Sequence, residues 1–146
     1  MTNRKLDDIL EKFKQILTVE KIMTPREAFE YYEDWMDNLD ETNFDILPAK
    51  NLKEYWNRKD KEFHRITSEI IVNTDLELWN LIDYFKDRDF YFVEQNGEIV
   101  GLVHFSDLNK QYVRILFYII ISELELKMHK VCNEKYRENE EEIKRK

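Results

Sequence analysis

The strongest constraint in this sequence is a pair of apolar runs joined through Asn96-Gly97. The first run is Phe90-Tyr91-Phe92-Val93, and the second is Ile99-Val100-Gly101-Leu102-Val103. Aromatic and β-branched residues favour strands, and Asn-Gly suits a tight turn whose residues need positive φ angles. The pattern therefore predicts a β-hairpin, and any fold of this chain must place that hairpin in a sheet.

Helical patterns lie on both sides of the hairpin. Apolar residues from Leu6 to Leu17 recur at helical spacing and predict an amphipathic helix that needs a partner surface. Thr24-Pro25 predicts the start of a helix that reaches about Leu39, and the residues from Leu76 to Phe85 predict another. A long final helix is expected from near Ser106 to about Tyr136, buried on more than one side in its first half, with residues 138–146 fraying.

Two stretches of the chain follow the same order of strand, capped helix, strand and strand. They run from about 20 to 60 and from about 66 to 108. Phe44-Asp45-Ile46-Leu47, followed by a partner strand over 52–56, matches Phe90-Tyr91-Phe92-Val93, and Asp60 falls opposite Asp107. The charged segment 57–65 is interpreted as a solvated connector. A repeat that cannot bury its sheet alone would pack against its twin.

The segment from Gly101 to Leu108 carries a family resemblance. Its order is a glycine, two aliphatic residues, His104 at a Thr or Ser position, two further residues and Asp107. This resembles a CBS domain, the module named after cystathionine β-synthase, and the chain looks like a tandem pair with a degenerate first copy. The expected fold is α+β: two β-α-β-β repeats packed as a pair, with an N-terminal helix and a long C-terminal helix. The expected organisation within one globular domain is helix 1–19, first repeat 20–60, second repeat 61–110, and helix with tail 111–146.

The resemblance implies a regulatory module whose cleft between the repeats takes an adenosine-containing ligand such as AMP, ATP or S-adenosylmethionine. The aspartate that holds ribose hydroxyls in that family falls on Asp107, and the Thr or Ser position falls on His104. In the first repeat, Asp60 matches the aspartate, Asn57 replaces the Thr or Ser, and Glu54 replaces the glycine. The implied ligand-binding set is completed by three further residues: Ser106, Thr74 and Phe92.

Each of these residues also has an ordinary structural interpretation. Asp107 or Ser106 can simply be a cap for the exposed amides of the following helix, with no role in ligand binding. His104 can be a hydrogen-bonded histidine at a strand end, which is the interpretation favoured for this residue. Tyr91 or Phe92 can stack on an adenine or belong to the core.

The composition excludes several classes of protein. The net charge of −8 argues against a nucleic-acid binder, which needs a basic face. The single Cys132 excludes an internal disulfide and fits a reducing compartment. The spacing of His64, His129 and Cys132 matches no zinc pattern, so no metal is expected. Neither a signal peptide nor a membrane span is visible, which predicts a cytoplasmic protein.

Two functional hypotheses follow. The first is a non-catalytic CBS-pair sensor for an adenine nucleotide or nucleoside, acting as a homodimer on a separate effector protein. The second is a scaffold without a ligand, in which the first and last helices dock a partner protein or a second copy. No catalytic motif appears in the sequence, so an enzyme is not expected.

Overall fold

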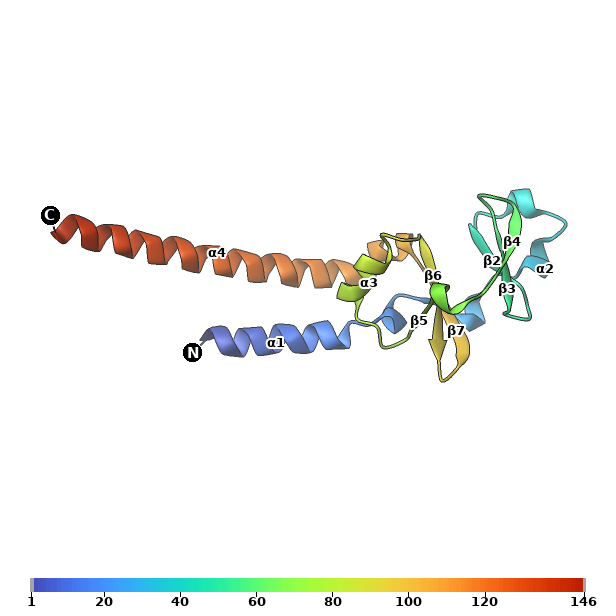
Figure 1. The fold of residues 1–146 in the computed structure, drawn as a ribbon, viewed down its shortest axis with the longest axis horizontal. Coiled ribbons are helices and arrows are strands. Elements are labelled where there is room, and N and C mark those ends of the chain that lie inside the picture. The colour runs from blue at the N-terminus through green and yellow to red at the C-terminus, as the bar shows by residue number, and fades with distance from the viewer. Residues whose placement is uncertain (1, 146) are drawn as a thin grey trace.

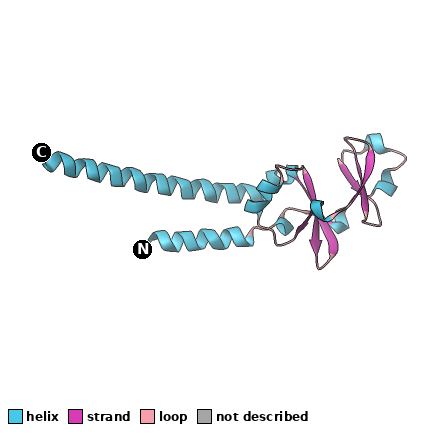
Figure 2. Ribbon diagram, in the orientation of Figure 1, coloured by secondary structure: helices cyan, strands magenta, loops and turns pink. Residues whose placement is uncertain are grey.

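The computed structural model describes residues 2–145, apart from the side chains of Thr2, Asn3, Leu6, Leu10 and Tyr112. A body of two small sheets carries an arm of two helices that point away from it (Figures 1 and 2). The helices are α1 Thr2–Ile16, α2 Tyr32–Trp35, α3 Leu78–Tyr84 and α4 Gln111–Arg145. The strands are β1 Thr24–Pro25, β2 Ile46–Pro48, β3 Glu54–Asn57, β4 Glu62–Arg65, β5 Ile71–Asn73, β6 Phe90–Gln95 and β7 Glu98–His104.

The hairpin predicted around Asn96-Gly97 is confirmed as β6 and β7. Asn96 has a φ of 52° and Gly97 a φ of 81°, the left-handed backbone that this turn requires. The hairpin forms the centre of a sheet with the order β1-β7-β6-β5, in which β5 runs parallel to β6. The most apolar segment of the chain thus occupies the middle of its larger sheet.

The two sheets exchange strands. β1 lies at the start of the first repeat yet pairs with β7 of the second, where Thr24 lies opposite Leu102. β4 lies at the start of the second repeat, as bounded at 61–110, yet pairs with β3 of the first, where His64 lies opposite Tyr55, in a sheet of order β2-β3-β4. The trio β4-β3-β2 therefore repeats the topology of β1-β7-β6. This is the paired arrangement expected from the repeat, and each sheet needs a strand from the other half of the sequence.

The core has two parts because β6 is buried on both faces. Successive side chains of a strand point to opposite faces, so Phe90 and Phe92 face one way and Tyr91 and Val93 the other. The first part lies between the repeats and joins Ile46 and Tyr55 to Phe90 and Phe92, together with Ile70. The second part packs the other face against α3, the start of α4 and the segment after α1; it includes Leu17, Val19, Ile22, Leu78, Leu81, Val103, Val113 and Leu116.

Two predictions for the first repeat are wrong. The helix expected over 25–39 is reduced to α2 and two single 3-10 turns, because Thr24 and Pro25 are held in β1 and the aromatic residues pack on the β3–β4 hairpin. Tyr32 shows this packing, with its ring centroid 4.5 Å from that of Phe63. The charged segment 57–65 is not a plain connector, since its second half is β4. Charged side chains are typical of such edge strands.

The last helix differs from its prediction at both ends. Residues 105–109 form a separate 3-10 turn, α4 begins at Gln111, and the helix continues through the expected frayed tail to Arg145. Its sequence has neither proline nor glycine to stop it. Val113 and Leu116 are buried, but most of the following apolar side chains are exposed, so the expected burial holds only near the body. Among residues 2–145, no helix is both long enough and apolar enough to cross a membrane.

Gly101 permits the close approach of β1 to β7. A Cβ atom at this position would collide with the sulfur of Met23 and would lie 3.0 Å from the carbonyl oxygen of Thr24. We expect Gly101→Ala to lower the free energy of unfolding by about 1–3 kcal/mol, as overpacking does. Urea denaturation measures this, and a variant as stable as the native chain would show that the two strands are less tightly apposed.

Candidate functional site

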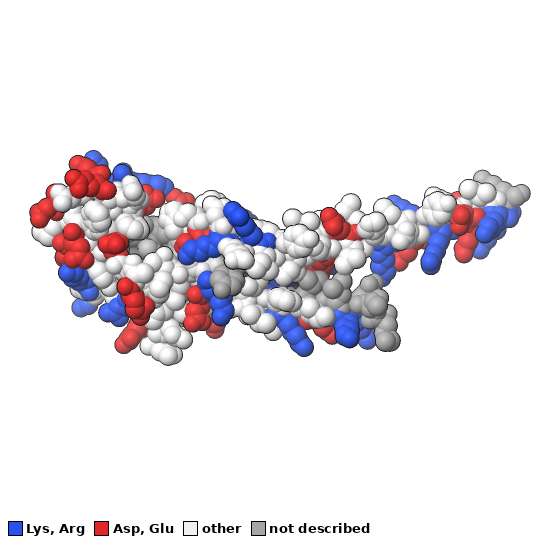
Figure 3. Space-filling view, turned by 180° about the vertical axis from the view of Figure 1, so that it is seen from behind, with Lys and Arg blue, Asp and Glu red and all other residues white. Residues whose placement is uncertain are grey.

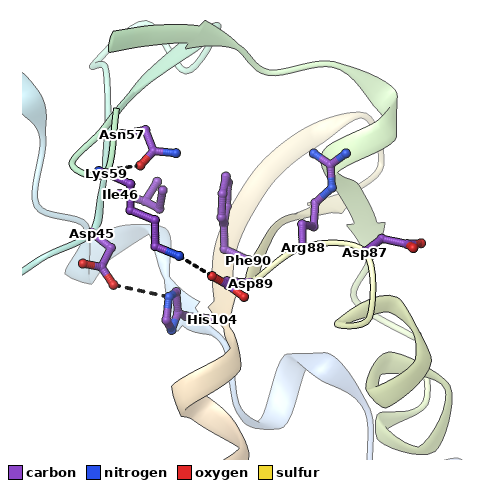
Figure 4. Close-up of a pocket in the computed structure, with 9 residues that line it drawn as sticks. All are labelled: Asp45, Ile46, Asn57, Lys59, Asp87, Arg88, Asp89, Phe90 and His104. Atoms are coloured by element: carbon purple, nitrogen blue, oxygen red, sulfur yellow. Dashed lines mark hydrogen bonds and ion pairs between the residues drawn. The ribbon is translucent and has the colours of Figure 1, made fainter. Parts of the chain in front are cut away.

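A pocket of about 280 Å³ lies where the two repeats meet, at the start of β2 and β6 and the end of β3 and β7. Figure 4 shows side chains from both repeats converging on it. Its lining residues are Asp45, Ile46, Asn57 and Lys59 from the first repeat, and Asp87, Arg88, Asp89, Phe90 and His104 from the second. The lining therefore carries three carboxylates and two cations beside one aliphatic and one aromatic side chain, and the Asp87 carboxylate points away from the others (Figure 4).

The strand registers relate the two halves of this lining. Asn57 pairs with Ile46 in one sheet, and His104 pairs with Phe90 in the other. Because Asn57 and His104 occupy the same motif position, Ile46 corresponds to Phe90 and Asp45 to Asp89. The match of Phe44 with Phe90 is thus wrong by two residues, since Phe44 precedes β2 and is half exposed.

Each of the two related aspartates reaches a side chain from the other repeat. An oxygen of Asp45 lies 3.5 Å from Nε2 of His104, and Nζ of Lys59 donates to Asp89 at 2.6 Å (Figure 4). The hydrogen bond from Lys59 and its charge lower the pKa of Asp89, and the same contact raises the pKa of Lys59. The two repeats are therefore bridged twice beside the pocket, once by each aspartate.

His104 is oriented from its other side by the turn that follows β7. The Ser106 amide donates to His104 Nδ1 at 3.1 Å, and the Asp107 carboxylate accepts the His104 amide at 2.8 Å. An accepting Nδ1 leaves the proton of a neutral imidazole on Nε2, which is the atom that faces Asp45. His104 can therefore donate a hydrogen bond into the pocket without being protonated twice.

Of the residues expected to bind a ligand, His104 and Asn57 line the pocket. Asp107 lines a smaller hollow of about 140 Å³ that shares Asp45 and His104 with the pocket. Its side chain is 13% exposed and pairs with Lys110 at 3.1 Å, so the capping interpretation describes its present contacts. Ser106 is exposed in the same turn.

The remaining expected ligand residues lie elsewhere. Asp60 sits in the exposed β3–β4 turn and contacts His64 at 2.6 Å. Thr74 is buried beside Glu94, at the opposite end of β6 from Phe90. Phe92 is fully buried between the repeats, where its ring packs near Tyr55 with centroids 5.5 Å apart. The interior between the sheets is filled by these rings, and the space for a ligand is at its end.

Sequence reasoning missed seven of the nine lining residues: the charged Asp45, Lys59, Asp87, Arg88 and Asp89, and the apolar Ile46 and Phe90. The sequence did contain one signal for two of these residues, Asp45 and Asp89. Both Asp45 and Asp89 come directly before the first residue of a strand, in Asp45-Ile46 and Asp89-Phe90. An alignment that placed these aspartates together would have identified the related pair.

A second group of polar side chains lies on the β3–β4 hairpin. Asp60, Glu62 and His64 place one ligand atom each within 4.8 Å of one another. The two carboxylates are exposed, and the contact of His64 with Asp60 already accounts for their proximity. This group is separate from the pocket residues.

The Lys59–Asp89 contact gives a prediction for pH titration. A depressed pKa means that the pair stabilises the fold above the unfolded-state pKa of about 3.9, and that this contribution is lost as the pH falls through the folded-state value. Lys59→Met should return the pKa of Asp89 towards its ordinary range, which NMR titration of the carboxyl carbon measures. If the Asp89 pKa is the same in both proteins, the ion pair does not persist in solution.

Comparison with known proteins finds similarity in structure alone. Neither the family models nor the curated proteins searched give a match to the sequence. The CBS domain of the bacterial CNNM/CorC family Mg²⁺ transporter in complex with ATP superposes with a TM-score of 0.54 at 17% identity, over 77% of this chain and 98% of that one. The chain has the CBS-domain fold.

Two other superpositions are of similar quality. The CBS domain of a putative transporter from Clostridium difficile 630 has a TM-score of 0.51 at 15% identity, covering 70% of this chain and 97% of that one. A conserved protein domain of unknown function from Neisseria meningitidis MC58 has a TM-score of 0.51 at 20% identity, covering 73% and 84%. At these identities the comparisons establish the fold of the two CBS-like repeats.

Proposed function

We propose that this chain is a regulatory, non-catalytic CBS-pair module that binds an adenosine-containing ligand in the pocket between its repeats. The observation that carries the proposal is that Asp45 and Asp89 occupy equivalent positions in the two repeats and that both line the same pocket. Carboxylate oxygens accept hydrogen bonds from vicinal ribose hydroxyls. The complex with ATP of the structurally similar transporter domain supports a nucleotide as the class of ligand.

The lining divides by chemistry in a way that suits a nucleoside. Ile46 and Phe90 offer apolar surface for a base, and Phe90 presents an aromatic face. Asn57 and His104 offer polar groups at equivalent strand ends, which can fix the orientation of the ligand. Lys59 and Arg88 lie on opposite sides of Phe90, with the Arg88 guanidinium 5.8 Å from the centre of the Tyr91 ring, and either cation can supply positive charge for the phosphates of AMP or ATP (Figure 4).

Isothermal titration calorimetry with adenosine, AMP, ATP and S-adenosylmethionine tests the proposal. Binding of at least one of them is expected, and the difference between adenosine and AMP measures what Arg88 and Lys59 contribute. Phe63→Ala, on exposed β4 away from the pocket, is a matched control that should bind as the native chain does. If none of the four ligands produces heat or a thermal shift, the proposal fails.

A second candidate function has its own support. The space between the sheets is filled by Tyr55, Phe90 and Phe92, and the two arm helices expose apolar side chains. These features favour a CBS-like scaffold whose purpose is association with another protein or a second copy. In the face shown in Figure 3, acidic and basic side chains are interspersed over the body without a broad basic area, which suits a protein partner better than nucleic acid.

A further inference from the structure

α4 exposes a continuous apolar stripe once it leaves the body. Val113 and Leu116 are fully buried in the core, but five apolar side chains that follow along one face of the helix are 40–59% exposed. Figure 1 shows that α4 continues well beyond the body and beyond the end of α1. The stripe consists of Phe117, Ile121, Leu124, Met128 and Val131.

The spacing of the stripe specifies the kind of surface that covers it. Its members are separated alternately by four and three residues, a mean repeat of 3.5. A straight α-helix has 3.6 residues per turn, so an apolar repeat of 3.5 matches a second helix wound around the first in a left-handed coiled coil. The stripe is about 21 Å long, and each of its five residues would form one layer of apolar contacts between two paired helices.

α1 does not cover this stripe, although it runs beside α4 (Figure 1). It exposes apolar side chains of its own, Ile9, Phe13 and Ile16, at the same alternating spacing. The arm is therefore a two-helix unit with open apolar surface on both helices. Apolar surface of this extent marks an association site.

We propose that the stripe of α4 pairs with the same stripe of a second copy of this chain, with the two helices parallel. In a parallel pair, each apolar residue meets its own equivalent. The next two positions of the same repeat, Lys135 and Glu138, are charged, so the apolar contact ends at Val131; in the parallel pair each Lys135 then has Glu138 of the other copy one layer away to offset the meeting of like charges.

The antiparallel arrangement fails on the same criterion. With the helices in opposite directions and Leu124 packed against Met128 of the second copy, Glu125 would lie beside Glu125 of that copy and Lys127 beside Lys127. Like charges at these flanking positions repel. In the parallel dimer the two bodies lie at the same end of the helix pair, beside each other, and both pockets remain in place. The proposal is independent of whether the pocket binds a ligand.

Light scattering after size-exclusion chromatography tests the association. The native chain of 18.1 kDa should elute at twice that mass. Leu124→Glu should return it to the monomer mass, whereas Leu126→Glu should leave the dimer intact, since Leu126 lies on the opposite face of the helix with a similar exposure of 52%. Circular dichroism checks that both variants remain folded. A monomeric native chain, or equal effects of the two substitutions, overturns the proposal.

A disulfide tests the orientation. In a Cys132→Ser background, Val131→Cys places one thiol in the stripe, and a parallel pair brings the two thiols into range of each other. Mild oxidation should then convert most of the protein to a covalent dimer, which non-reducing electrophoresis detects. Asn133→Cys in the same background, pointing away from the stripe, should remain monomeric on the gel. Equal cross-linking of both variants, or none in either, contradicts the parallel pair.

Discussion

Phe92→Ala is expected to lower the free energy of unfolding by about 3–5 kcal/mol. Phe92 is fully buried between the two sheets, in contact range of Tyr55 from the first repeat and Phe90 from the second. Removing the ring leaves a cavity at the junction on which both repeats depend. Domains of this size have a total stability of about 5–15 kcal/mol, so the loss is a large part of the whole.

Phe44→Ala is the matched control for this prediction. Phe44 is 50% exposed and lies outside β2, so its truncation should change the free energy of unfolding by no more than about 0.5 kcal/mol. Urea denaturation of the two variants also tests the register, because the sequence alignment equated Phe44 with Phe90. Equal destabilisation by both substitutions would mean that the buried faces of β2 and β6 are assigned incorrectly.

The second large effect is expected on ligand affinity. Asp45→Ala and Asp89→Ala should each weaken binding of the adenosine-containing ligand by about 10–100-fold, since a hydrogen bond to a charged acceptor contributes about 1.5–3 kcal/mol. The two effects should be of similar size, because the two carboxylates hold equivalent places in the repeats. Calorimetric titration gives both dissociation constants.

Asp60→Ala provides the contrast. Asp60 belongs to the exposed turn between β3 and β4 and contacts His64, away from the pocket lining. We expect its substitution to change the affinity by less than twofold. A loss at Asp60 that exceeds the losses at Asp45 and Asp89 would place the ligand at the position suggested by the motif alignment, and would remove the pocket from the account.

The second repeat was predictable because its signals are local. Asn96-Gly97 specifies the hairpin, and the alternation of Phe90, Tyr91, Phe92 and Val93 is that of a strand, although both of its faces are buried. The family motif ends in the turn that holds His104 and Asp107, so this part of the site was also visible from sequence.

The first repeat was less predictable because tertiary contacts override its local pattern. Residues 25–39 carry apolar side chains at helical spacing, yet β1 pairs with β7, which is far away in the sequence. β4 has the charged composition of a loop, and its identity as a strand depends on its pairing with β3. The residues within and next to each of these strands do not indicate that the strand pairs with a distant part of the chain.

The pocket could be inferred from the sequence only in part, because it too depends on contacts between segments that are distant in the sequence. Lys59 and Arg88 lie in loops, and their approach to Asp89 and the pocket depends on how the repeats close on each other. Asp45 and Asp89 were the detectable pair, since each precedes a strand that begins with an apolar residue. The motif alignment favoured matching two phenylalanines over matching two aspartates, and this displaced the register.

A two-dimensional amide NMR titration of ¹⁵N-labelled protein with the ligand that calorimetry selects is the most direct test of the shared pocket. The largest shifts are expected at residues from both repeats together, at Asp45, Ile46 and Asn57 as well as Phe90 and His104. Shifts centred on Asp60 and Thr74, or confined to one repeat, would contradict a ligand site built jointly by the two.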